Sequence, residues 1–201
     1  MHMNSLTLPK MEHLALSGGG ILFFGEAMAR LSAYLISRLA LQGKSITLLD
    51  AAQAFNPYWV ARSGRYVGAQ ARPLLERIRL SRAFTCHQLV TLICEILPCQ
   101  KQQESLFILG PCLLFYDDQV NLKERQILFQ QIVRSLTLLK ERGQGCYLFQ
   151  GPISRRAKNQ HFGRVLAKSV QWVIQVEQSG HGLEGKVLKA GLEEIKNVPQ
   201  R

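Results

Sequence analysis

The stretch LFILGPCLLFYDDQVNLKERQILFQQIVRSLTLLKERGQGCYLFQ, residues 106–150, contains two short apolar runs separated by a long segment with helical spacing. Residues 106–109 and 147–150 are the apolar runs, and each has the length and composition of a buried strand. Residues 122–142 between them predict a helix with one inward face. The apolar positions of this face are Ile127, Ile132, Leu136 and Leu139. A strand, a helix and a second strand in this order indicate a parallel sheet covered by helices.

The same alternation extends to both sides of this stretch. Further strands are predicted at residues 13–17, 45–50 and 78–84, and further helices at residues 25–41, from Pro57 to a break at Gly64 and Gly68, and 85–97. Residues 154–164 are polar and basic and predict a loop, and residues 170–176 and 186–192 predict an antiparallel hairpin. The expected fold class is therefore α/β, with a mostly parallel sheet flanked by helices and a C-terminal antiparallel hairpin.

Length and composition favour one domain over residues 1–201. Apolar residues make up 47% of the chain and charged residues 19%, so a sizeable core can form. Lys and Arg number 25 against 14 Asp and Glu, and 25 − 14 gives a net charge of +11. A positive field of this size favours an anionic partner, such as nucleic acid or an anionic membrane surface.

The cysteine content and the hydropathy of the chain indicate the cellular compartment. The five cysteines form an odd set without a C-x-x-C pair, which argues against a disulfide framework and a zinc ribbon and favours buried thiols. No apolar run reaches the roughly 18 to 20 residues of a membrane helix, and no secretory signal opens the chain. We therefore expect a reducing cytoplasmic or nuclear setting and no membrane partner.

The segment GILFFGEA, residues 20–27, has the glycine spacing of the phosphate-binding pattern G-x-x-x-x-G-K-[ST]. It lies between a predicted strand and a predicted helix, where such a loop belongs. Glu26 and Ala27 stand where the pattern places the phosphate-binding lysine and the magnesium-binding hydroxyl. Two glycines at this spacing also fit an ordinary strand-to-helix turn.

Two further segments, DAAQAFNP at residues 50–57 and SRAFTCHQ at residues 81–88, resemble the ATPase core of RecA-like recombinases, specifically the Rad branch. The order of later segments supports this resemblance, since residues 106–110 occupy the position of the Walker B strand. The resemblance covers residues 14–192 and implies a P-loop-type core. We expect no counterpart of the helical N-terminal domain of the Rad recombinases or of their Phe-x-x-Ala peptide.

The resemblance implies a degenerate nucleotide site. The Walker B aspartate maps to Gly110, the water-activating glutamate to Ala52 and the nucleotide-sensing glutamine to Gln150. Together with the phosphate-loop positions, the site comprises Gly20, Gly25, Glu26, Ala27, Ala52, Gly110 and Gln150. Phosphoryl transfer depends on positioning and electrostatic stabilisation of the phosphates, so these replacements predict no hydrolysis and neither ATP nor magnesium as a cofactor.

The resemblance also assigns the segment after Gln150 to a second DNA-binding loop. Its candidate DNA-binding residues are Arg155, Arg156, Lys158, Phe162 and Arg164. Cations contact the phosphates of single-stranded DNA, and an aromatic ring beside them can stack on its bases. A second basic patch, for phosphates or for an acidic protein, comprises Arg62, Arg65, Arg72, Arg77, Arg79 and Arg82. Trp59 and Trp172 are interpreted as core or interface anchors.

The function predicted from the sequence is a catalytically inactive, Rad-paralogue-type accessory protein that binds DNA, a recombination partner, or both in DNA repair. One alternative is a divergent active ATPase in which Arg30 or a partner subunit supplies the missing charge. The other is a pseudo-ATPase scaffold that binds protein and not DNA.

Overall fold

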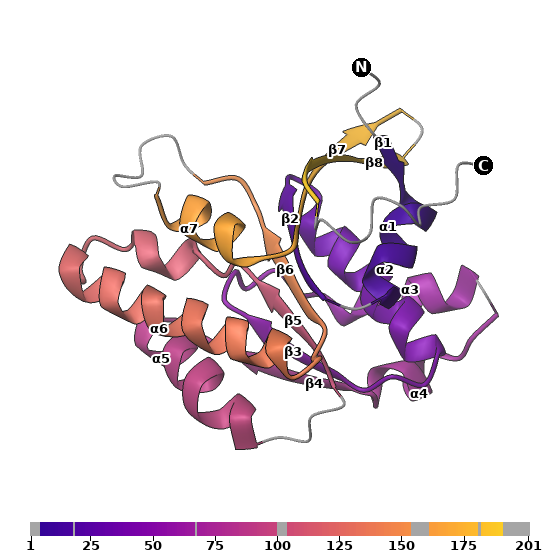
Figure 1. The fold of residues 1–201 in the computed structure, drawn as a ribbon. Helices are drawn as coiled ribbons and strands as arrows, with labels where there is room; N and C mark the ends of the chain where they lie inside the picture. Colours follow the sequence, from indigo (N-terminus) through magenta and orange to yellow (C-terminus); the bar gives the residue numbers. More distant parts are fainter. Residues whose placement is uncertain are drawn as a thin grey trace.

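The computed structural model describes residues 5–17, 19–66, 68–99, 104–153, 161–180 and 182–190, and within these residues eight strands form one mixed sheet (Figure 1). Their order across the sheet is β1-β8-β7-β2-β6-β5-β3-β4. The strands are β1 (Ser5–Thr7), β2 (Gly20–Gly25), β3 (Ile46–Asp50), β4 (Ile78–Arg82), β5 (Ser105–Leu109), β6 (Cys146–Gln150), β7 (Trp172–Ser179) and β8 (Gly182–Lys189).

Most neighbouring strands run parallel, as the alternating sequence pattern predicts. The six strands from β7 to β4 in the sheet order are all parallel to one another. Strand β8 pairs antiparallel with β7, and β1 pairs antiparallel with β8. The α/β class, the mostly parallel sheet and the C-terminal antiparallel hairpin are thereby confirmed.

Helices cover both faces of the sheet. Helices α1 to α4 lie on one face and α5 to α7 on the other (Figure 1). The α-helices are α1 (Leu8–Ser17), α2 (Met28–Leu41), α3 (Pro57–Tyr66), α4 (Ala71–Leu75), α5 (Cys86–Thr91), α6 (Leu122–Glu141) and α7 (His161–Ser169). Helix α5 continues through a π turn, Leu92–Ile96, into a 3-10 turn, Leu97–Cys99, and a second 3-10 turn spans Leu113–Tyr116.

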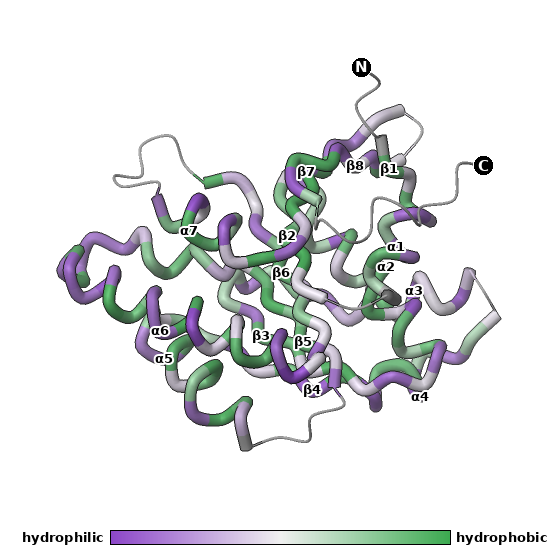
Figure 2. The backbone as a smooth tube through the Cα atoms, in the orientation of Figure 1, coloured by the Kyte–Doolittle hydropathy of each residue, from purple (hydrophilic) through white to green (hydrophobic). Residues whose placement is uncertain are grey.

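Successive residues of the central strands point alternately into two separate hydrophobic cores. In β2, Ile21 and Phe23 face the core under α1 to α4, whereas Leu22 faces the core under α5 to α7. This alternation follows from the two-residue period of a strand, and burial on both faces explains the continuous apolar runs. The apolar tube through β5 and β6 in Figure 2 shows the same feature. Phe149 stacks on Phe23 and Phe107, with ring centroids 5.2 and 5.5 Å away.

The first predicted strand is wrong, because residues 13–17 belong to helix α1. Met11, Leu14 and Ala15 recur at helical spacing and are buried together against the sheet. The first central strand is instead β2, residues 20–25, which the sequence pattern had assigned to a loop. This shift places the glycine pair inside the sheet.

Three local predictions also need correction. Gly64 does not end α3, since the helix continues to Tyr66 and Gly64 is buried where an added Cβ would lie 2.4 Å from Leu74. Ile127 is 59% exposed, because Phe129 rather than Ile127 lies on the inward face of α6. Of the predicted basic loop, residues 161–164 form the start of α7, and residues 154–160 lie outside the described residues.

Candidate functional site

Most positions of the predicted nucleotide site gather at one edge of the sheet. Residues 25–27 follow β2, Ala52 follows β3, Gly110 follows β5, and Gln150 ends β6. Because these strands are parallel and β5 lies between β3 and β6, their carboxyl ends form a single edge. Ligands of α/β sheets commonly bind at such an edge. Gly20 is the exception, since it begins β2 at the opposite end.

The connection from β2 to α2 is too short to be a phosphate-binding loop. Strand β2 ends at Gly25 and helix α2 begins at Met28, so only Glu26 and Ala27 lie between them. Interpreting residues 20–27 as a loop is therefore wrong. A phosphate loop needs several successive backbone amides around the anion, and a two-residue connection does not supply them.

Gly25 has a packing role at this edge. Its φ of +148° is rarely adopted by residues with a side chain, and it pairs with Val176 of β7. A Cβ at this position would lie 2.0 Å from the Val176 carbonyl oxygen. Close approach of two strands therefore accounts for this glycine.

Gly110 and Ala52 pack directly against each other. Gly110 has a φ of +70°, and a Cβ placed there would lie 2.8 Å from the Ala52 Cβ. The positions that the resemblance assigns to two catalytic acids are therefore in contact across the β3 and β5 ends. A carboxylate at Gly110 would collide with Ala52, so the close packing of these two positions depends on small residues at both.

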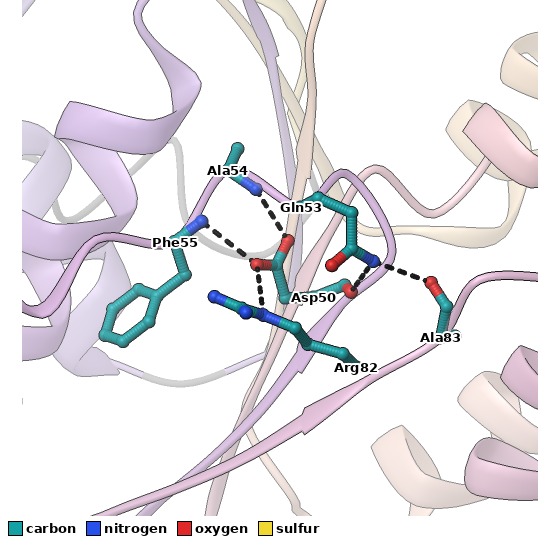
Figure 3. A network of polar contacts seen from close by, with 6 residues as sticks. All are labelled: Asp50, Gln53, Ala54, Phe55, Arg82 and Ala83. Carbon is teal, nitrogen blue, oxygen red and sulfur yellow. Dashed lines mark hydrogen bonds and ion pairs between the residues drawn. The ribbon is translucent and has the colours of Figure 1, made fainter.

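Asp50 ties the end of β3 to the segment that follows it. Its fully buried carboxylate accepts hydrogen bonds from the backbone nitrogens of Ala54 and Phe55 at 3.1 and 3.0 Å (Figure 3). Arg82 of β4 lies on the other side, with its Nε 3.6 Å from the carboxylate. Each carboxylate oxygen thus has a partner within the protein, as a buried charge requires.

Gln53 closes the same turn from its solvent side. Its φ of +54° lies in the left-handed region. The side-chain amide donates hydrogen bonds to the carbonyls of Asp50 and Ala83 at 3.2 and 2.9 Å (Figure 3). The residues after β3 are therefore fixed to the residues after β4.

Gln150 is likewise engaged with the backbone. Its Oε1 accepts a hydrogen bond from the Cys112 nitrogen at 3.0 Å, and its Nε2 donates to the Gly151 carbonyl at 2.9 Å. Burial raises the pKa of the neighbouring Cys112 thiol well above its usual range, which keeps that thiol protonated. The Oε1 of Gln150 thus joins the end of β6 to the segment that follows β5, and its Nε2 is occupied by the next residue of the chain.

The predicted basic residues are not equivalent in the structure. Phe162 is 1% exposed and packs on Phe115, Tyr116 and Phe129, so its ring is not available to stack on a base. Arg164 is exposed on α7. Arg155, Arg156 and Lys158 lie outside the described residues.

The second basic patch divides into separate groups. Four of its arginines have partners close by: Arg72 pairs with Glu76, Arg77 donates to the Gly43 carbonyl, Arg79 pairs with Glu104, and Arg82 pairs with Asp50. Arg62 and Arg65 belong to α3, and Arg62 donates to the Tyr66 hydroxyl. The six arginines therefore do not form one continuous basic track.

The chain matches no known protein-family model and no curated protein. Within the described residues, no helix is long and apolar enough to span a bilayer, and no cluster of His, Cys, Asp or Glu is arranged to hold a metal ion. The resemblance to the recombinase core therefore remains a prediction from sequence.

The buried Asp50 and its partners were missed by sequence reasoning. The residue ends a run of apolar positions, ITLLD, and an acid at the carboxyl end of a buried strand is a signal for either a ligand contact or a structural hydrogen-bond acceptor. Its partner Arg82 lies 32 positions later, and only the parallel pairing of β3 with β4 brings the two together.

Proposed function

We propose that this protein is a non-catalytic accessory factor of DNA recombination or repair that binds single-stranded DNA and does not hydrolyse ATP. The contact between Gly110 and Ala52 carries this proposal. In the predicted recombinase core these positions hold the two acids of the hydrolytic site, and here a Cβ added at Gly110 would lie 2.8 Å from the Ala52 Cβ, which leaves no room for a carboxylate at Gly110.

Two further observations support the absence of hydrolysis. The two-residue connection after β2 offers no amide cradle for phosphates. Two polar groups at the carboxyl edge, Gln150 and Asp50, are committed to hydrogen bonds within the protein. The edge that would bind a nucleotide is thus held together by the protein's own contacts.

The net charge of +11 supports a polyanionic partner. The basic segment around Arg155, Arg156 and Lys158 enters the proposal from the sequence, and exposed Arg164 lies just after it. Four cations that each contact a phosphate of single-stranded DNA would give a log-log salt slope of about −3, from roughly −0.7 per phosphate.

The test combines DNA binding with ATP turnover. Fluorescence anisotropy of labelled oligo(dT) over a salt series should give a slope of this size, and Arg155→Glu with Arg156→Glu should abolish most of the affinity. The matched control is Lys123→Glu with Arg134→Glu, which changes the net charge equally on the exposed side of α6. Steady-state phosphate release above background, or no binding to oligo(dT) at low salt, would refute the proposal.

The outer strand β4 favours a second candidate, a protein-binding scaffold. Among the described strands β4 pairs only with β3, and Leu80 on this strand and Phe84 just after its end are exposed. An open strand edge with apolar side chains is a surface for pairing with another chain. A scaffold without DNA binding would show no anisotropy change at any salt concentration, so the same experiment separates the two functions.

A further inference from the structure

A pocket of about 280 Å³ opens on the face of the molecule covered by α1 to α4. It lies between the start of α1, helices α2 and α3, and the β7-β8 hairpin. Its polar and aromatic lining includes Arg30, Tyr34, Trp59, Arg62 and Tyr66. This pocket is separate from the carboxyl-edge residues described above, none of which lines it.

Two arginines share one indole ring in this pocket. The guanidinium carbons of Arg30 and Arg62 lie 5.5 and 5.6 Å from the centroid of Trp59. Both contacts are in the range of a cation-π interaction, which holds each positive charge against the electron-rich face of the ring. Arg30, an alternative source of catalytic charge in the sequence analysis, is therefore oriented by α3.

The charge in this pocket is not balanced by acidic groups. The pocket lining, all of it within the described residues, contains no Asp or Glu, and neither arginine forms an ion pair with a described carboxylate. The nearby Glu12 is engaged by Tyr34 and Arg38 at 2.7 Å each. Two guanidiniums held beside one ring repel each other, and an anion that contacts both would relieve this repulsion.

Aromatic surface continues outward from the pocket along α3. Tyr58, Arg62 and Tyr66 recur every four residues, so they form one stripe on the helix. Tyr66 is 76% exposed, although its hydroxyl accepts hydrogen bonds from Arg62. The guanidinium of Arg62 can therefore contact a phosphate, and the exposed tyrosine rings beside it can stack on bases.

We infer that this pocket binds a segment of single-stranded DNA, with Arg30 and Arg62 on the phosphodiester and the Tyr66 ring against a base. This inference rests on the proposed function for the identity of the polyanion, and it adds a site distant in sequence from the basic segment at residues 155–164. An acidic peptide would use the two charges but not the exposed rings, so the aromatic stripe favours a nucleic acid.

Intrinsic fluorescence provides the test, because Trp59 lines the pocket and Trp172 is only 4% exposed. Oligo(dT) should quench the emission saturably, and Trp59→Phe should remove the quenching. Arg30→Gln with Arg62→Gln should weaken the fluorescence-detected affinity about tenfold or more. The matched control, Lys123→Gln with Arg134→Gln, should change it far less.

Three other ligands test whether the pocket recognises DNA bases or only negative charge. An abasic deoxyribose-phosphate oligomer should bind several-fold more weakly than oligo(dT), and Tyr66→Ala should remove this difference. Poly-glutamate or inorganic phosphate that quenches Trp59 as strongly as oligo(dT) would overturn the inference in favour of a general anion site.

Anisotropy on the same samples separates the inference about the pocket from the proposed function. Binding of oligo(dT) without quenching of Trp59 would overturn only the pocket, whereas no binding at all would overturn both.

Discussion

At the scale of single residues, the carboxylate of Asp50 shows how an acid at the end of a buried strand stabilises the turn that follows it. It is buried and has two backbone donors and one arginine, so its charge is satisfied within the turn that follows β3. Arg82 is far more accessible, with 45% of its side chain exposed. The two partners should therefore contribute unequally to stability, since solvent screens the exposed one.

Asp50→Asn should lower the free energy of unfolding by about 2 to 3 kcal/mol, because an amide NH2 group would face a backbone N–H. Arg82→Gln should cost about 1 kcal/mol or less, because solvent can replace the guanidinium. Urea unfolding followed by circular dichroism measures both. An Arg82 variant less stable than the Asp50 variant would contradict the hydrogen-bond scheme.

Gly110→Ala tests the packed pair at the carboxyl edge. Gly110 and Gly143 have φ values of +70° and +76°, but only the former has a neighbour within 4 Å of an added Cβ. Gly143→Ala should therefore cost only the backbone term of about 1 to 2 kcal/mol, and Gly110→Ala should cost about 1 to 3 kcal/mol more. Equal losses of unfolding free energy would show that the contact with Ala52 is not tight.

At the scale of secondary-structure elements, Lys189 of β8 joins the hairpin to the end of α7. Its Nζ donates to the carbonyls of Ala167, Lys168 and Val170 at 3.1, 3.0 and 2.5 Å. Those carbonyls lie at the helix C-terminus, where backbone acceptors lack partners within the helix and a cation is favoured. One side chain thus caps the helix and fixes the strand beside it.

Lys189→Met should lower the free energy of unfolding by about 1 to 2 kcal/mol and increase hydrogen exchange in the last turn of α7. Lys186→Met on the same strand is the control, since Lys186 is exposed. Hydrogen-exchange mass spectrometry on both variants measures the local effect. Unchanged exchange in α7 with the Lys189 variant would show that the cap contributes nothing.

Strands β3, β5 and β6 and helix α6 were predictable, because these strands are short apolar runs and this helix has a regular apolar stripe. Helix α7 was not predicted, since its first residues were assigned to a basic loop. Thr85 caps α5, since its Oγ1 accepts a hydrogen bond from the Gln88 nitrogen, and threonine is a residue type favoured at this position. The β2 assignment failed because GILFFG resembles both a buried strand and a glycine-flanked loop. Tertiary pairing with β6 and β7 on both sides decides in favour of the strand.

The site was only partly predictable, for a related reason. The resemblance assigned Ala52, Gly110 and Gln150 to one nucleotide site, and parallel pairing brings them to one edge of the sheet. It could not show that Gly110 and Ala52 touch, since this depends on the register of β3 with β5. The pocket at Trp59 was missed because its lining comes from four separated parts of the chain.

At the scale of the whole molecule, the positive charge and the closed carboxyl edge predict opposite responses to two anions. A ligand that binds only the folded state stabilises it by RT ln(1 + [L]/Kd), about 2.7 kcal/mol at one hundred times Kd. For a chain of this size that stabilisation should raise the melting temperature by roughly 5 to 10 °C. Oligo(dT) at low salt should produce such a rise, and added salt should remove it because screening and counterion release weaken the contacts.

Millimolar ATP with magnesium should leave the melting temperature unchanged, because no phosphate cradle follows β2 and both Gln150 and Asp50 at the edge are already bonded within the protein. ATP without magnesium and inorganic tripolyphosphate are the controls, since both are polyanions that act through general charge. Differential scanning fluorimetry at equal ionic strength measures all four ligands. A rise with magnesium-ATP that exceeds the rise with tripolyphosphate would require a nucleotide site. If that rise persisted in the Arg30→Gln with Arg62→Gln variant, the site would lie at the carboxyl edge, and the packing of Gly110 on Ala52 would have to open in solution.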